Sequence, residues 1–242
     1  GKIMAGYQGW FHTPCDNANR AWRHWSANRH SPNKHTSTFE MWPDTREYGT
    51  DELCPTNFRY SDGSPAQLFS SYNPQTVHRH TQWMMEYGID GVFVQRFIQS
   101  AVNRRSDRDQ VLNNVRSGCE EHGRVFANMY DISGGDPRTT ISDLKKDWMH
   151  LVDDLHITES DRYLHHRGRP VLAIWGFGFE NRVGEPQQVL ELLEWLQQGA
   201  AERYRTTVMG GVPTSWRYLF GDAKANLAWK RVYELFDVLS PW

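Results

Sequence analysis

The sequence predicts an α/β fold built on a parallel sheet, and three observations lead to this class. Short apolar segments rich in β-branched and aromatic residues alternate with segments whose apolar residues recur at helical spacing. The short segments are apolar at successive positions, which is typical of parallel strands covered on both faces. From the second one onward they begin about 30 to 45 residues apart, the pitch of a strand–helix unit.

Each element follows from its local pattern. The apolar runs predict six strands, at residues 3–10, 91–97, 125–131, 170–176, 206–212 and 236–242. Apolar residues three and four apart predict one helix through Leu144 and Leu155, and another through Val189 and Leu196 that begins near Pro186. Further helices are expected at residues 76–87, 109–122 and 222–235.

Six strands and five helices admit two arrangements. One is an open, doubly wound sheet, and the other is a TIM-type (β/α)8 barrel that is truncated after the sixth strand. No GxGxxG motif follows the first strand, which weighs against the nucleotide-binding form of the open sheet. We therefore expect residues 1–242 to form a single barrel domain, incomplete at its C-terminus. Its strands would lie in sequential order and leave two unpaired edges, so the isolated chain would be marginally stable.

Composition narrows the class of protein. The chain has 242 residues, and its 27 Lys and Arg balance 29 Asp and Glu, which excludes the strongly basic surface of a nucleic-acid-binding protein. No apolar run reaches the roughly 18 to 20 residues that a membrane-spanning helix needs. The 11 tryptophans supply either core packing or flat surfaces for ligands such as sugars.

The cysteines and histidines show no pattern of metal ligands. None of Cys15, Cys54 and Cys119 belongs to a CxxC motif, so a structural zinc site is not expected. Cys15 and Cys54 could form a disulfide in an exported protein, whereas Cys119 lies on a predicted helix as a buried free thiol. His78 and His80 are two positions apart on a predicted helix and therefore point apart. We expect no metal ion and no cofactor.

The longest segment without a predicted element is residues 11–73, between the first strand and the first helix. It is rich in Pro, Asn and Trp, and structureless segments of this length usually serve as lids or binding loops. It leaves the C-terminal end of a strand, the face on which parallel α/β enzymes build their sites. We therefore expect His24, Trp25, Trp42 and Asp44 to close over that face.

Polar and aromatic side chains recur at the C-terminal ends of the predicted strands. Tyr and Trp present flat faces to the C–H side of a sugar, whereas Arg, Asp and Gln hydrogen-bond its hydroxyl groups. The pattern therefore predicts a concave site with a carbohydrate as its partner. The expected binding residues at the strand ends are Tyr7, Gln8, Trp10, Gln95, Arg96, Tyr130, Trp175 and Trp242, with Asp131 as the candidate catalytic carboxylate.

Five longer motifs follow one another along the chain. They are MAGYQGWF (4–11), AWRHW (21–25), MWPDTREY (41–48), MEYGIDGVFVQRF (85–97) and YLHHRGRPVLAIWGFGF (163–179). Together they resemble bacterial glycoside hydrolases related to families 71 and 99, a group commonly described as xylosidase/arabinosidase. The resemblance implies a (β/α)8 barrel acting on a polysaccharide or oligosaccharide. It favours an extracytoplasmic or secreted protein and leaves the oligomeric state open.

The same resemblance implies where the catalytic pair of carboxyl groups should lie. Relatives in family 99 use two glutamates of a Glu-x-x-Glu motif late in the barrel, and similar sequences carry a DE-x-x-EGT segment after the seventh or eighth strand. This chain has no such segment, so the paired glutamates are expected beyond its end. Asp131 would then assist by binding sugar hydroxyls, or would cap the following helix. The alternative function is a non-catalytic carbohydrate-binding or remnant protein with the same groove.

Overall fold

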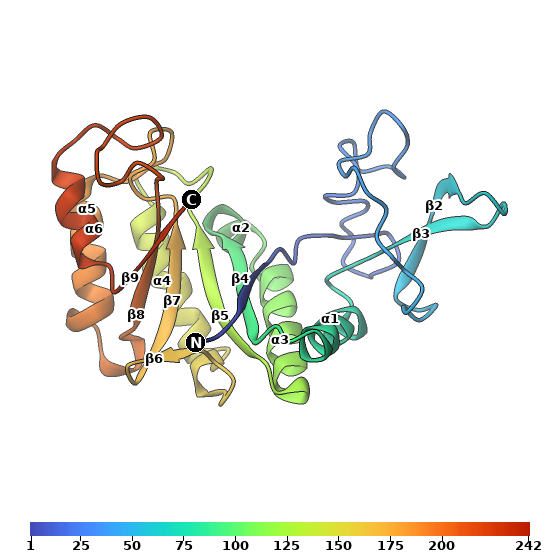
Figure 1. Ribbon diagram of the computed structural model, residues 1–242, viewed down its shortest axis with the longest axis horizontal. Coiled ribbons are helices and arrows are strands. Elements are labelled where there is room, and N and C mark those ends of the chain that lie inside the picture. The colour runs from blue at the N-terminus through green and yellow to red at the C-terminus, as the bar shows by residue number, and fades with distance from the viewer.

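Six parallel strands form a curled sheet in the computed structural model, which describes residues 1–242 (Figure 1). The strands are Met4–Tyr7 (β1), Gly91–Phe97 (β4), Val125–Asp131 (β5), Arg169–Trp175 (β7), Thr207–Val212 (β8) and Val238–Pro241 (β9). They pair in the order β1-β4-β5-β7-β8-β9, and the short strand His165–His166 (β6) pairs antiparallel with β7. The order follows the chain without reversal, and β1 and β9 are the open edges. The predicted barrel order is thus confirmed and the doubly wound sheet is excluded.

Helices cover the outer face of the sheet. They are Pro74–Glu86 (α1), Ile98–Asn103 (α2), Arg105–His122 (α3), Thr140–Asp153 (α4), Pro186–Glu194 (α5) and Ala228–Leu235 (α6). Five of them overlap predicted helices, whereas α2 was not predicted because six residues are too few to show a helical period. One continuous apolar core fills the space between the sheet and the helices. None of these helices is both long and apolar enough to cross a membrane.

The two faces of each strand differ in burial. On β4, Arg96 is buried on the outer face, whereas Gln95 and Phe97 are half-buried on the concave inner face. Strand β5 repeats this pattern in register, with Tyr130 opposite Arg96 and Asp131 opposite Phe97. Because side chains alternate along a strand, adjacent residues at one strand end point to opposite faces.

Residues 11–73 form an N-terminal lobe rather than a lid. The lobe contains an antiparallel hairpin, Leu53–Arg59 (β2) and Pro65–Phe69 (β3), and a small core of its own. In Figure 1 it projects sideways beyond α1 and α3. The expectation of a structureless segment was therefore wrong, because residues 53–69 form a hairpin. The aromatic residues of this segment pack mainly on each other, which gives the lobe a small core of its own.

A disulfide joins Cys15 to Cys54 within the lobe, with the two Cα atoms 5.6 Å apart. It bridges 39 positions of a lobe with few regular elements and so restricts the unfolded chain. Cys119 is a buried free cysteine on α3. Both outcomes agree with the sequence analysis, in which Cys15 and Cys54 share one long segment and Cys119 lies on a helix.

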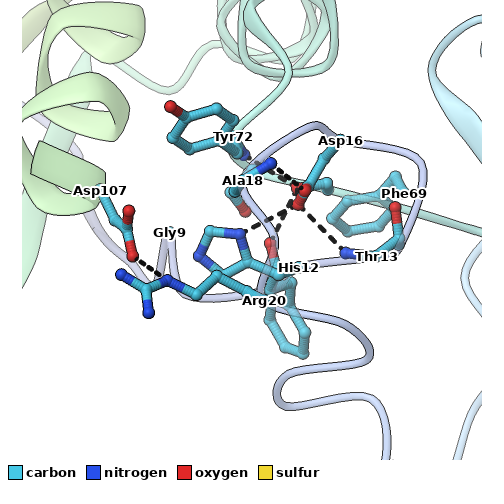
Figure 2. A network of polar contacts seen from close by, with 12 residues as sticks. Gly9, His12, Thr13, Asp16, Ala18, Arg20, Phe69, Tyr72 and Asp107 are labelled. Carbon is cyan, nitrogen blue, oxygen red and sulfur yellow. Dashed lines mark hydrogen bonds and ion pairs between the residues drawn. The ribbon is translucent and has the colours of Figure 1, made fainter. Parts of the chain in front are cut away.

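A buried carboxylate organises the start of the lobe (Figure 2). Asp16 accepts hydrogen bonds from His12 at 3.0 Å, from the Ser70 hydroxyl at 2.7 Å and from backbone amides. Burial alone would raise the pKa of Asp16, but these hydrogen bonds outweigh it and lower the pKa. Nearby, Arg20 pairs with Asp107 of α3 at 2.5 Å and fastens the lobe to the barrel.

A half-buried histidine joins the lobe, β1 and α1. His80 Nδ1 lies 2.9 Å from the hydroxyl of Tyr7, and its Nε2 lies 2.7 Å from the hydroxyl of Tyr48. Burial, with a smaller contribution from the charge of Arg79, lowers the pKa of His80 to about 4. The imidazole is therefore neutral at pH 7, with one donor and one acceptor for the two hydroxyls.

Candidate functional site

A cavity of about 220 Å³ opens at the C-terminal ends of the strands on the concave face; we call it the strand-end cavity. Its residues occupy either inward-facing strand positions or the loops that follow strands. They are Gly6, Gln8, Gln95, Met129, Asp131, Ser133, Trp175, Gly176, Phe179, Arg182 and Trp242. The structure thus brings five predicted residues together: Gln8, Gln95, Asp131, Trp175 and Trp242.

Trp175 forms an aromatic surface of the cavity at the end of β7. It lies opposite Gly211 of β8, where a Cβ atom would come within 2.3 Å of the indole Cδ2. The glycine therefore makes room for the ring. Trp242 meets the ring edge to face, with centroids 4.7 Å apart. The indole Nε1 is buried without a hydrogen-bond partner, so this donor is unused by the protein.

Asp131 lies in register with Trp175 on the neighbouring strand. Its carboxylate accepts a hydrogen bond from Gln95 Nε2 and another from the Ser133 amide, each at 2.8 Å. These two bonds fix the direction of the carboxylate and leave it capacity to accept further donors. Helix α4 begins at Thr140, so the alternative role of Asp131 as a helix cap is wrong.

Tyr7, Arg96 and Tyr130 were predicted in the same site, but they do not line it. Arg96 Nε and the Tyr130 hydroxyl both donate to Asp147 on α4, each at 2.7 Å. The Tyr7 hydroxyl is hydrogen-bonded to His80 on α1. The prediction took every polar or aromatic residue at a strand end. The side-chain period of two sends each of these three to the helix-covered face instead.

Three lobe residues predicted to close over the site lie elsewhere. Trp25 is buried in the small lobe core and donates its Nε1 hydrogen to the Phe69 carbonyl at 2.9 Å. Trp42 Nε1 donates to the Gln67 carbonyl at 3.1 Å, and Asp44 is exposed on the lobe surface. The indole donors of both tryptophans are used by the hairpin strand β3 of the lobe. That long-range pairing gives no local signal in the sequence.

Trp10 and His24 line a second cavity of about 490 Å³, which shares Gln8 with the strand-end cavity. The Trp10 ring is stacked with both His24 and Phe97, at centroid distances of 4.8 and 5.5 Å. This aromatic stack connects the lobe to the inner face of β4. His24 is therefore the one lobe residue of the four predicted that stands beside the strand ends.

The strand-end cavity is also lined by three residues that were not predicted from the sequence: Ser133, Phe179 and Arg182. They follow β5 and β7 in the chain, so their signal was their position directly after a predicted strand. Gly176 and Gly178 have positive φ angles of 116° and 83°, and these values turn the chain sharply after Trp175. The turn directs Phe179 and Arg182 back towards the sheet.

The strand-end cavity suits a polar organic ligand better than a metal ion. It holds one carboxylate, no His and no Cys, whereas a protein metal site uses three or more such ligands. Its aromatic faces lie next to two side-chain amides and one guanidinium. This mixture of flat apolar surface and hydrogen-bonding groups is typical of a site for polyhydroxylated ligands.

The fold and the site together define a class of protein. It is an open α/β barrel with aromatic and polar groups at the C-terminal ends of its strands. Neither a protein-family model nor a curated protein matches the sequence. Two solved structures of the GH99 endo-alpha-mannosidase from Bacteroides thetaiotaomicron do match, one of them in complex with BIS-TRIS-propane.

The match to these structures extends over 99% of this chain. The complex has a TM-score of 0.54 at 12% identity, with 68% of its chain covered. The other structure has a TM-score of 0.56 at 13% identity, with 70% covered. At such identities the likeness shows the fold, and the chain therefore has a family 99-like fold.

Proposed function

We propose that this chain forms the sugar-binding part of a glycoside hydrolase that acts on a polysaccharide or oligosaccharide. The observation that carries the proposal is the pairing of Trp175 with Asp131. They lie in register on adjacent strands and line the same cavity at the end of a barrel sheet. The family 99-like fold supports the same class of activity, since both solved neighbours are glycosidases.

Each group at the cavity has a role that its chemistry supports. The Trp175 face would stack on the C–H side of a pyranose or furanose ring, and its free Nε1 donor would bind a ring or hydroxyl oxygen. Gln8 and Gln95 each offer a donor and an acceptor for hydroxyl groups. Arg182 would add a cationic donor at the rim.

Hydrolysis of a glycosidic bond needs two carboxyl groups, one as acid and the other as base or nucleophile. Asp131 is the single carboxylate lining the strand-end cavity. We propose that it assists by hydrogen-bonding a sugar hydroxyl near the reacting carbon. The two catalytic carboxyl groups would then come from residues that do not line this cavity.

Two substrate classes compete within this proposal. The sequence motifs resemble enzymes described as xylosidase/arabinosidase, whereas the solved neighbours are endo-mannosidases. The presence of one carboxylate also keeps the non-catalytic carbohydrate-binding protein as a second candidate. The two candidates share the sugar-binding cavity and differ only in turnover.

Binding and hydrolysis can be tested together on a panel of mannan, xylan and arabinan. The tested proteins are the 242-residue chain and the chain extended by any further coding sequence. Affinity electrophoresis would measure binding, and release of reducing ends would measure hydrolysis. We expect Trp175→Ala to weaken binding of the preferred polysaccharide at least tenfold, because the stacking surface is lost.

Tyr87→Ala provides a matched control, since Tyr87 is an exposed aromatic residue that directly follows α1 and lies outside both cavities. Binding with unchanged affinity in Trp175→Ala, or no binding to any polysaccharide, would refute the carbohydrate site. Binding by the extended chain without release of reducing ends would favour the non-catalytic candidate.

A further inference from the structure

A cluster of metal-ligating side chains lies on the outer surface, where α1 packs against α3. It consists of His78 on α1 and of Glu121 and His122 in the last turn of α3. Gly118 brings the helices together here, because a Cβ atom at this position would lie 2.6 Å from the Thr81 hydroxyl and 3.4 Å from the His78 Cα. The close approach places the His78 imidazole beside the end of α3.

The donor atoms of the three side chains lie within 4.8 Å of one another. His78 Nδ1 is 2.5 Å from one Glu121 carboxylate oxygen, and His122 Nε2 is 4.0 Å from the other. Four-coordinate Zn²⁺ has ligand bonds near 2.0 to 2.2 Å, which place its ligands roughly 3.4 Å apart. The observed separations bracket that value. Rotation of three side chains that all retain some exposure would suffice to reach it.

The surroundings of the cluster favour a cation. His122 is the last residue of α3, and the αL cap at Gly123 ends the helix there, so unpaired carbonyls give this end a partial negative charge. The neighbouring Arg79 does not oppose a cation, because it pairs with Glu52 at 2.6 Å. A cavity of about 300 Å³ borders all three ligands and leaves space for a water molecule as the fourth.

We propose that His78, Glu121 and His122 bind a divalent transition-metal ion of the Zn²⁺ class, with water in the remaining position. Two imidazoles and one carboxylate form a ligand set that Zn²⁺ commonly adopts. The ion would fasten α1 to α3 on the face opposite the strand-end cavity, so its effect is on stability. The site is independent of the proposed glycosidase activity.

The sequence analysis expected no metal ion, and it expected His78 and His80 to point apart on one helix. The structure confirms that the two side chains take different directions. His80 turns inward to Tyr7 and Tyr48, whereas His78 turns outward to Glu121. The other two ligands come from a helix that lies about 40 residues further along the chain.

The test uses the untagged 242-residue chain after removal of metal with a chelator. Titration with Zn²⁺ is followed by calorimetry, and titration with Co²⁺ is followed by its visible absorption as a tetrahedral site forms. We expect one ion per chain with micromolar affinity. A hundredfold excess of Zn²⁺ over its dissociation constant should raise Tm by about 5 to 10 °C.

The variants His78→Ala, Glu121→Gln and His122→Ala should each weaken Zn²⁺ binding at least tenfold and abolish the shift in Tm. Glu121→Gln keeps the size of the side chain and guards against a loss of binding caused by misfolding. His35→Ala is the matched control, because His35 is an exposed histidine outside the cluster. Zn²⁺ binding of unchanged affinity in His78→Ala, or no binding below 1 mM, would overturn the proposal.

Discussion

The inner and outer faces of β4 and β5 carry different chemistry at adjacent positions. On the inner face, Gln95 and Asp131 are half-buried at the strand-end cavity. One residue away on each strand, Arg96 and Tyr130 are buried beneath α3 and α4. The difference shows that location at a strand end does not by itself place a residue in a site. The side chain must also point to the concave face of the sheet.

The outer face holds a buried network of charges. Arg96 binds Asp147 through two hydrogen bonds of 2.7 and 2.8 Å and Asp109 through one of 2.8 Å. Burial alone would raise the pKa of Asp147, but the hydrogen bond and charge of Arg96 outweigh it and lower the pKa. His150 completes the network at 2.8 Å from Asp109. Such mutual pairing compensates the cost of burying these groups and serves the structure.

The largest expected effect is on this outer network. Arg96→Ala leaves Asp147 and Asp109 without their shared cation, and we expect the free energy of unfolding to fall by about 3 to 5 kcal/mol. Urea denaturation followed by circular dichroism would measure it. The adjacent inner-face variant Gln95→Ala should cost less than about 1 kcal/mol. Equal losses in the two variants would remove the distinction between the faces.

A milder outer-face variant keeps this test open if Arg96→Ala does not fold. Tyr130→Phe removes one donor to Asp147 and retains the ring in the core. We expect a loss of about 1 to 2 kcal/mol in the same urea experiment. Sugar binding by the folded Tyr130→Phe protein should match that of the parent chain, since the hydroxyl does not line the cavity.

His80, at the outer face of β1, should make the free energy of unfolding depend on pH. His80, which is bonded to Tyr7, has its pKa lowered from 6.5 to about 4 by burial. Between pH 6.5 and pH 4, the unfolded chain therefore binds a proton at His80 that the folded chain does not bind. We expect the free energy of unfolding to fall by about 3 kcal/mol as the pH drops from 6.5 to 4.

Denaturation curves across pH 4 to 8 would measure this dependence. His80→Gln removes the titrating group, so its unfolding free energy should change less between pH 6.5 and 4 than that of the parent chain. The variant is less stable at pH 7 but still has an amide for the two tyrosine hydroxyls. An identical pH dependence in both proteins would assign the effect to other groups.

On the inner face, Gly211→Ala should displace the Trp175 ring. The new methyl group would lie 2.3 Å from the indole, so we expect a loss of about 1 to 3 kcal/mol in stability and a clear loss of sugar affinity. Gly6→Ala is the matched control, because Gly6 lines the same cavity with no atom within 4 Å of an added Cβ. Comparable destabilisation by both substitutions would contradict the packing argument.

The smallest expected change in stability comes from Asp131→Asn. The amide keeps the shape of the carboxylate and one acceptor oxygen, so the free energy of unfolding should change by no more than about 1 kcal/mol. Polysaccharide binding should weaken, since the anionic acceptor for sugar hydroxyls is lost. Calorimetric titration with the preferred polysaccharide would measure the weakening. Unchanged affinity would leave Asp131 without a role in the proposed site.

The sequence by itself determined the six parallel strands, most of the helices and their barrel order, but it did not predict β2, β3 or β6. Apolar runs such as residues 91–97 and 125–131 carry a local period, and their alternation with helices admits few topologies. The same local signals placed Asp131 and Trp175 at strand ends. The alternation that sends Arg96 outward is also present in the sequence, once the face covered by helices is known.

The tertiary structure alone decided where residues 11–73 go and which helix partners His78 meets. Trp25 and Trp42 were equally compatible with a sugar site or a core, and contacts with β3, distant in sequence, selected the core. Likewise, the approach of α1 to α3 at Gly118 joins His78 to Glu121 across 43 positions of the chain. Both outcomes depend on the packing of distant segments, which no local period in the sequence encodes.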